Sequence, residues 1–325
     1  MTGGVPLLGF GLPVSGSWAT PEIMVRVARR AEELGYASLW TFQRVLSPVD
    51  SELGPAHRSV HDSIVALAYV AGHTDRIGLG TATLCAPFTA PALLAKALTS
   101  LDVVSGGRLT VGLGIGWLPE EYAAAGVSFE RRGARMDEYL RCLTALWTQD
   151  PAEFSGEFYT VPRSHMGPMP VQRPHPPLLL GGTAGPALRR AGRLAQGWIA
   201  SSQQDPARIG ACIETVRDGA RESGRDPQDL RVVVRGSVDL VDRSLGVRRR
   251  PFQGAQGQVL DDLEALGEQG VTEVFLDLNL SSRVGSPYVD AVESLDYAER
   301  VLDAFAPGVT GAPGVSVTGG RQPSR

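Results

Sequence analysis

Two kinds of segment alternate along the chain: short apolar runs typical of buried strands, and longer segments in which apolar residues recur every three or four positions. Residues 76–117 contain one complete unit of this pattern. Residues 77–84 are a β-prone run, the leucines of 93–101 have helical spacing, and 109–113 is a second buried run. The unit predicts two parallel strands joined by a right-handed helical crossover.

The same alternation continues over the rest of the chain. Thr20 before Pro21, and Asp62 before an apolar segment, are typical of helix starts. The runs expected to form strands are 7–13, 37–42, 77–84, 109–113, 176–182, 197–201, 230–238 and 273–279. Eight strands, each followed by helical sequence, predict an α/β fold with a single TIM (β/α)8 barrel. The active site of such a barrel lies at the carboxyl ends of the strands, in the loops that follow them.

Two segments stand outside the eight repeats. Residues 148–174 form an insertion between the fourth helix and the fifth strand, and its sequence EFSGEFYTV predicts a small hairpin. The barrel domain is expected over residues 1–306. Residues 307–325, rich in Gly, Pro, Ser and Thr, are expected to form a flexible C-terminal tail.

An open, doubly wound sheet is the alternative architecture. Its dinucleotide-binding unit would begin at the strand that contains Gly112, Gly114 and Gly116. The required pattern G-x-G-x-x-G fails there, because Trp117 stands three residues after Gly114. The barrel therefore explains the chain better.

Charge and cysteine content exclude several kinds of partner. A formal net charge of −4 gives no basic footprint for nucleic acid or an anionic membrane surface, and no apolar run reaches the ~20 residues that span a bilayer. The first residues lack the pattern of a secretory signal. Cys85, Cys142 and Cys212 are odd in number and far apart, which is typical of reduced thiols in the cytoplasm.

Around the expected strand ends the sequence resembles the luciferase-like monooxygenase superfamily, specifically its F420-dependent (deazaflavin) oxidoreductase branch. The resemblance covers residues 7–305 and depends on the number, order and spacing of its motifs. These include LGFGLP, SLWTFQR, RIGLGTATLCAPFTAPALLAKALTSLDVVSGGRLTVGLGIGW, EEYAAAGVSFERRGARMDEYLRCLTALW, PVQRPHPPLLLGG and RPFQGAQGQVLDDLEALGEQGVTEVFLDL.

The resemblance implies that a flavin or its deaza-analogue lies at the mouth of the barrel. Gly181, Gly182 and Thr183 suit its phosphate, because glycines allow close backbone approach and a helix N-terminus attracts an anion. A plain strand-to-helix turn is the alternative. The residues expected beside the cofactor ring are Phe42, Ala82, Thr83, Cys85, Ile115, Gly116, Trp117 and Glu120.

Three of these expectations carry open questions. Similar enzymes have a non-proline cis peptide bond in the third strand, which the motif places at Ala82-Thr83. Trp117 offers a flat wall to the ring or the substrate, with an ordinary core position as the alternative. Glu120 and its neighbour Glu121 are equal candidates for meeting a polar edge of the cofactor or capping the next helix.

The end of the second strand departs from the family pattern. Many deazaflavin dehydrogenases of this superfamily carry an Asp-His pair at the positions of Gln43 and Arg44. Neither residue is an acid–base group near neutral pH. Arg44 is expected to fix a substrate carboxylate, polarise a carbonyl or anchor the cofactor's acidic tail, with a loop salt bridge as the alternative. Gln43 is expected to hydrogen-bond the ring's polar edge.

Other chemistries find less support. Lys96, the single lysine, lies within a predicted helix and does not suit a Schiff-base aldolase. His57 and His61 lie in a Pro-rich loop without a third ligand, so no metal site is expected. The run from Arg248 to Arg250 lies on the catalytic rim, where it either attracts the acidic tail of a deazaflavin or is simply solvated.

The resemblance thus implies an oxidoreductase that uses coenzyme F420, transfers a hydride between the deazaflavin and a small organic substrate, and forms a homodimer. The missing histidine favours reduction of a C=C or C=N bond over alcohol oxidation. An FMN-dependent monooxygenase using reduced FMN and oxygen is the first alternative, because it shares the fold and most motifs. A non-catalytic flavin-binding barrel is the second.

Overall fold

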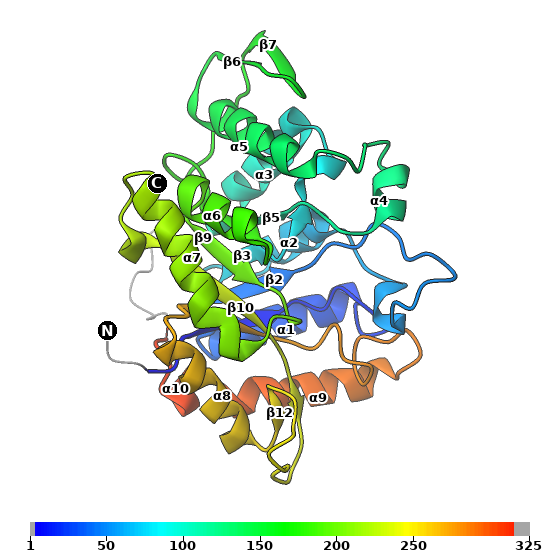
Figure 1. The fold of residues 1–325 in the computed structure, drawn as a ribbon. Coiled ribbons are helices and arrows are strands. Elements are labelled where there is room, and N and C mark those ends of the chain that lie inside the picture. Colours follow the sequence, from blue (N-terminus) through cyan, green and yellow to red (C-terminus); the bar gives the residue numbers. More distant parts are fainter. Residues whose placement is uncertain (1–3, 315–325) are drawn as a thin grey trace, which may run out of the picture.

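Eight parallel strands form a closed barrel in the computed structural model, which describes residues 4–314 (Figure 1). The strands are β1 (Leu7–Gly11), β2 (Ser38–Thr41), β3 (Gly78–Thr81), β5 (Leu109–Gly114), β8 (Leu178–Gly181), β9 (Gly197–Ala200), β10 (Arg231–Ser237) and β13 (Glu273–Asp277). Each pairs with its sequence neighbours in the barrel, β1 with β13, and β3 with β5, which closes the circle. The predicted TIM barrel is confirmed.

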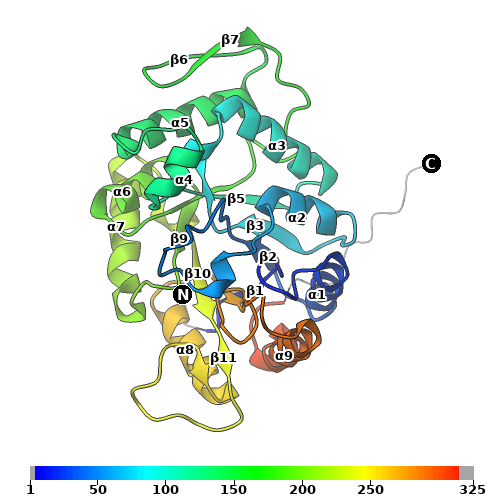
Figure 2. The same ribbon diagram turned by 90° about the vertical axis from the view of Figure 1, so that its right-hand side faces the viewer.

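The helices surround this barrel (Figures 1 and 2). They are α1 (Pro21–Glu33), α2 (Ser63–Ala71), α3 (Pro91–Val104), α5 (Arg132–Thr148), α6 (Gly185–Leu194), α7 (Ile209–Glu222), α8 (Gln256–Glu268) and α9 (Ala291–Ala304). Two predicted caps form, because Thr20 accepts a hydrogen bond from the amide of Ile23 and Asp62 accepts two at the start of α2. Each described helix is too short or too polar to span a bilayer.

Smaller elements decorate the two ends of the barrel. They are β4 (Leu84–Cys85), α4 (Pro119–Ala124), β6 (Ala152–Ser155), β7 (Thr160–Ser164), β11 (Asp239–Leu240), β12 (Gln253–Gly254) and α10 (Pro307–Thr310). Antiparallel pairing of β6 with β7 confirms the hairpin expected in the insertion. Of the segment expected as a flexible tail, the structure places α10 directly after the barrel, and residues 315–325 lie outside the described part.

The inside of the barrel is filled by side chains. Trp40 from β2 stacks on Phe275 from β13, with ring centroids 5.4 Å apart. Nearer the amino ends of the strands, the indole Nε1 of Trp40 donates to a carboxylate oxygen of Glu273 at 2.8 Å, and Arg231 pairs with the other oxygen at 3.1 Å. Since this interior is packed, a ligand has room only above it, at the carboxyl ends of the strands.

Candidate functional site

The end of β3 lies at the centre of the barrel mouth. The peptide bond Ala82-Thr83 is cis, as the motif predicts. The side chain of Thr83 packs against the ends of two neighbouring strands: a Cβ on Gly114 would lie 2.7 Å from its Oγ1, and one on Gly181 would lie 3.3 Å from its Cγ2. The structure therefore brings together three strand ends, β3, β5 and β8, at which sequence analysis places the cofactor.

The turn between β8 and α6 is open to solvent. Gly182 has a φ of +122°, and a Cβ there would come within 2.9 Å of the Cβ of Ala187, so the turn favours glycine. Gly182, Thr183 and Ala184 are exposed, and Ala184 gives α6 no side-chain cap. Within residues 4–314 the amides of Thr183 and Ala184 have no hydrogen-bond partner. Free amides at a helix N-terminus are suited to an anion.

Gln43 and Arg44 both bind protein groups at the mouth. The side-chain carbonyl of Gln43 accepts from the amide of Cys85 at 2.8 Å, which ties the end of β2 to β4. Arg44 forms a buried ion pair with Glu121 at 2.9 Å, and Glu121 also accepts from the amide of Val45 at 2.7 Å. The salt-bridge alternative for Arg44 is thus the arrangement seen. Of the two glutamates that sequence analysis could not separate, Glu121 points inward and Glu120 is exposed.

Trp117 stands at the edge of this ion pair. Its side chain is exposed, and the guanidinium carbon of Arg44 lies 5.2 Å from its ring centroid. The core alternative for Trp117 is therefore wrong. An exposed ring held by a buried arginine can serve as a wall of the mouth.

Cys85, Ile115 and Gly116 pack behind Trp117. The phenol of Tyr122 donates to the carbonyl of Ile115, and Gly116 has a φ of +71°. A Cβ on Gly116 would lie 2.6 Å from the Sγ of Cys85. Burial, with the nearby Glu121 carboxylate, raises the pKa of the Cys85 thiol. Because only a thiolate is a good nucleophile, Cys85 acts here as a packing residue.

Sequence analysis missed a buried arginine at the same place. Arg235 lies near the end of β10, directly across the barrel from β3, and its Nη2 donates to the carbonyl of Ala82 at 2.6 Å. Its Nε lies 3.4 Å from a carboxylate oxygen of Asp277, and its guanidinium lies over the rings of Phe42 and Phe275. The signal is present in the sequence, because an arginine directly after the apolar run 232–234 must find a partner if the strand is buried.

A histidine also reaches the mouth from the loop after β2. The ring of His57 meets Phe42 edge-on, with centroids 6.2 Å apart, and its Nδ1 is buried without a hydrogen-bond partner. Burial and the charges of Arg44 and Arg235 lower the pKa of His57. His61 contacts the carbonyl oxygen of Ala19 instead. Within residues 4–314, no group of three His, Cys, Asp or Glu side chains is arranged to hold a metal ion.

Comparison with known proteins agrees with this geometry. The family model described as luciferase-like monooxygenase matches residues 4–249. The chain belongs to the luciferase-like monooxygenase family. It is 30% identical over 228 residues to the FMNH(2)-dependent dimethylsulfone monooxygenase of Pseudomonas putida, covering 68% of this chain and 60% of that protein. It is also 30% identical over 230 residues to the F420-dependent glucose-6-phosphate dehydrogenase of Amycolatopsis mediterranei, covering 69% and 67%.

Solved structures of the luciferase-like family share the fold. The crystal structure of the monooxygenase RslO1 from Streptomyces bottropensis has a TM-score of 0.76 and 20% identity, and the match covers 93% of this chain and 99% of that one. The relatives are named as oxidoreductases and monooxygenases, so this luciferase-like protein is an enzyme of the oxidoreductase class. The relatives' names divide between F420 and reduced FMN.

Proposed function

We propose that this enzyme uses coenzyme F420 and transfers a hydride between the deazaflavin and a small organic substrate in the cytoplasm. The observation that carries the proposal is the uncapped turn at Gly181, Gly182 and Thr183, which lies beside the side chain of Thr83 at the mouth of the barrel. This turn would hold the phosphate of the cofactor, and the ends of β3 and β5 would then lie beside its ring. Preference for F420 rests on the motifs shared with the deazaflavin branch and on the F420-dependent relative.

The residues at the mouth fit such a group. Thr183 and Ala184 offer two free amides to the phosphate. We expect the ring to lie against Ala82, Thr83, Cys85 and Ile115, near the buried Phe42 and the half-buried Gly116, with the exposed Trp117 and Glu120 at its outer edge. The bound deazaflavin would supply the hydride-carrying ring carbon, and the protein would supply binding, orientation and electrostatics.

Gln43 and Arg44 act in this proposal by holding the mouth in shape. Gln43 fixes the backbone at Cys85, and Arg44 fixes both Glu121 and Trp117. Neither exchanges a proton near neutral pH, so alcohol oxidation would lack the side-chain base of the family pattern; in reduction of a C=C or C=N bond, the hydride would add to one atom and a proton from solvent to the other. Arg235 adds a fixed positive charge below the ring site, where it can stabilise negative charge that develops during transfer.

A monooxygenase that uses reduced FMN and oxygen is the second candidate. The dimethylsulfone monooxygenase is as similar to this chain as the F420-dependent relative is. The turn at Gly181, Gly182 and Thr183 (the phosphate turn) suits the phosphate of F420 and that of FMN equally. Only a direct comparison of the two cofactors therefore separates the candidates. In either case we propose that the enzyme is a homodimer.

Titration of the purified protein with F420 and, separately, FMN tests the proposal. Each cofactor is added oxidised and reduced while tryptophan fluorescence is followed. Trp117 is exposed and the other four tryptophans are buried, so quenching that disappears in Trp117→Leu reports a ring at the mouth. Tight F420 binding with weak FMN binding supports hydride transfer and directs the search to alkenes and imines. Preference for reduced FMN together with oxygen uptake would establish the monooxygenase instead.

A further inference from the structure

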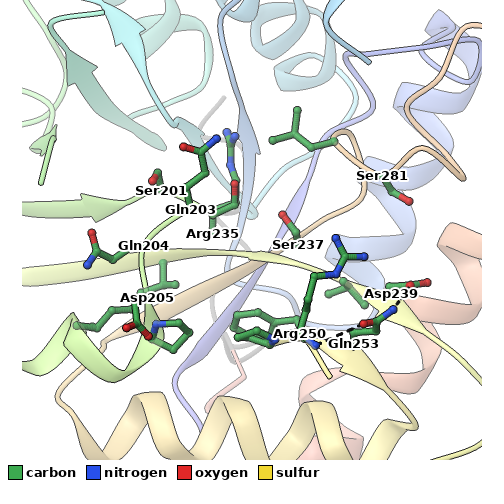
Figure 3. Close-up of a pocket in the computed structure, with 18 of the residues that line it drawn as sticks. Ser201, Gln203, Gln204, Asp205, Arg235, Ser237, Asp239, Arg250, Gln253 and Ser281 are labelled. Carbon is green, nitrogen blue, oxygen red and sulfur yellow. Dashed lines mark hydrogen bonds between the residues drawn. The ribbon is translucent and has the colours of Figure 1, made fainter. Parts of the chain in front are cut away.

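A polar cavity opens on the side of the mouth away from β3 and β5. It has a volume of about 590 Å³ and lies at the ends of β9, β10 and β13, beside the loop that follows β11 (Figure 3). That volume lies within the range of about 300–1,000 Å³ typical of small-molecule sites. Its polar side chains include Ser201, Gln203, Ser237, Arg250 and Ser281. Gly181, Gly182, Thr183 and Thr83 are not part of its wall, so the cavity is separate from the phosphate turn.

The charges in this wall leave one cation without a partner. Arg283 lies 3.7 Å from Asp239, and Arg235 lies 3.4 Å from Asp277. Asp205 caps a short helix by accepting from the amide of Ala207 at 3.0 Å. Within the described chain, the guanidinium of Arg250 has neither an ion-pair nor a hydrogen-bond partner. In Figure 3 it points toward the centre of the side chains that line the cavity, between Ser237 and Asp239.

Side-chain contacts tether the loop that carries Arg250 on both sides of this residue. Its neighbour Arg249 binds both carboxylate oxygens of Asp262 on α8, and Gln253 donates to Asp239 at 2.9 Å. These contacts fix the backbone on either side of Arg250 while its own side chain is left over the cavity. An arginine presented in this way favours an anion with two oxygens on one atom, such as a carboxylate or a phosphate.

Arg235 connects the cavity to the ring site. It lines the inner end of the cavity and also donates to the carbonyl of Ala82 at the mouth's centre. A ligand with its anionic end on Arg250 would therefore have its other end near Arg235 and the surface expected to face the ring. Serines and glutamines in the wall supply hydrogen bonds to hydroxyl or amide groups between the two ends.

We infer that this cavity binds the substrate, and that the substrate carries a carboxylate or phosphate recognised by Arg250. The inference rests on the proposed function in that it names the substrate class of the same enzyme. The acidic tail of F420 is the other source of such an anion. The substrate is favoured because the cavity reaches inward to Arg235, while its wall does not include Gly181, Gly182 and Thr183, where we propose that the phosphate of the cofactor binds.

Calorimetric titration with matched probes tests this inference. Glycerol 3-phosphate and malate serve as the anions, and glycerol serves as the uncharged partner of the first. We expect one or both anions to bind the wild-type protein, glycerol not to bind, and Arg250→Gln to weaken anion binding at least tenfold. Arg248→Gln makes the same charge change outside the cavity wall and should leave the affinity unchanged.

Repeating the titration with saturating F420, and with its tail-free riboside, separates the two anion sources. Simultaneous binding of probe and F420 supports a substrate site, whereas competition by F420 but not by the riboside would overturn it, because the tail would then occupy the cavity. The inference is also overturned if neither anion binds, or if Arg248→Gln weakens binding as much as Arg250→Gln. Arg250-dependent anion binding in a protein that binds neither F420 nor FMN would reject the proposed function and leave the cavity as an anion site.

Discussion

At the scale of single residues, breaking the buried ion pair between Arg44 and Glu121 should lower the free energy of unfolding strongly. Both side chains are less than 10% exposed, and the Nε of Arg44 already lacks a partner. Arg44→Met leaves Glu121 buried with only the amide of Val45, so we expect a loss of about 3 kcal/mol in the free energy of unfolding, at the lower end for a broken buried pair. Urea denaturation measures this loss.

The double variant Arg44→Met/Glu121→Leu is the control. It removes both charges and should recover most of the lost stability, because no buried charge is left without a partner. A single variant within about 1 kcal/mol of the wild type would show that the pair is solvated in solution.

His57 should make the protein less stable in mild acid. Its pKa is lowered in the folded state, so the unfolded chain takes up a proton first as the pH falls below 6.5. The free energy of unfolding should therefore fall between pH 7 and pH 5.5, and it should fall less in His57→Gln. His165→Gln removes an exposed histidine that contacts Asp150 on the insertion and has none of the burial that acts on His57, so it should not reduce the fall. Equal slopes for all three proteins would contradict the prediction.

Single residues also show where sequence analysis reaches its limit. The positions expected for Thr83, Gly182 and Trp117 follow from strand ends and family motifs. The structure places Thr83 against Gly114 and Gly181, and leaves Trp117 exposed beside Arg44. The position of His57 at the mouth could not be predicted, because His57 lies in a loop and the sequence of a loop has no hydrophobic periodicity that fixes its path. Arg235 was detectable in principle from its place in an apolar strand, but its partner across the barrel depends on closure of the sheet.

At the scale of elements, β3 and β5 approach each other so closely at Gly112 that a side chain has no room between them. A Cβ on Gly112 would lie 1.9 Å from the carbonyl oxygen of Thr81 and 2.5 Å from Ile199. Gly112→Ala must push two strands apart, so we expect a loss of stability at or above the upper end of about 1–3 kcal/mol, measured by thermal or urea unfolding. Thr83, which lies two residues after the end of β3, would shift with it.

Gly54→Ala provides the matched control. Gly54 lies in a loop with a φ of −61°, and a Cβ there meets nothing within 4 Å. The substitution should be neutral or slightly stabilising, because alanine restricts the unfolded chain. If Gly112→Ala proved as harmless as Gly54→Ala, the close approach of β3 and β5 would be wrong.

The eight strands were predictable because each is buried on both sides and reads as a short apolar run, as in VVV of β10 and VFL of β13. Their ends differ from the prediction by one to three residues, since the polar residues that finish a strand also begin its loop. The division of the third strand into β3 and β4 around the bond Ala82-Thr83 follows from the family motif and not from hydrophobic pattern.

At the scale of the whole molecule, the expected homodimer needs a surface that two copies can share. Helices α2 and α3 lie side by side on the outside of the barrel (Figure 2). Together they expose the apolar side chains of Val65, Tyr69, Leu93 and Val104. Neighbouring exposed apolar side chains on two helices are typical of a protein interface, and a twofold dimer is the commonest assembly.

We therefore expect sedimentation equilibrium to give twice the chain mass of 34.5 kDa. Leu93→Asp should shift the protein toward monomer, because it places a charge on this apolar surface. Val292→Asp on α9 is the control, since Val292 is 64% exposed and Leu93 67%, and it should remain dimeric. A dimer that tolerates Leu93→Asp would place the interface elsewhere, and a wild-type monomer would overturn the expected homodimer.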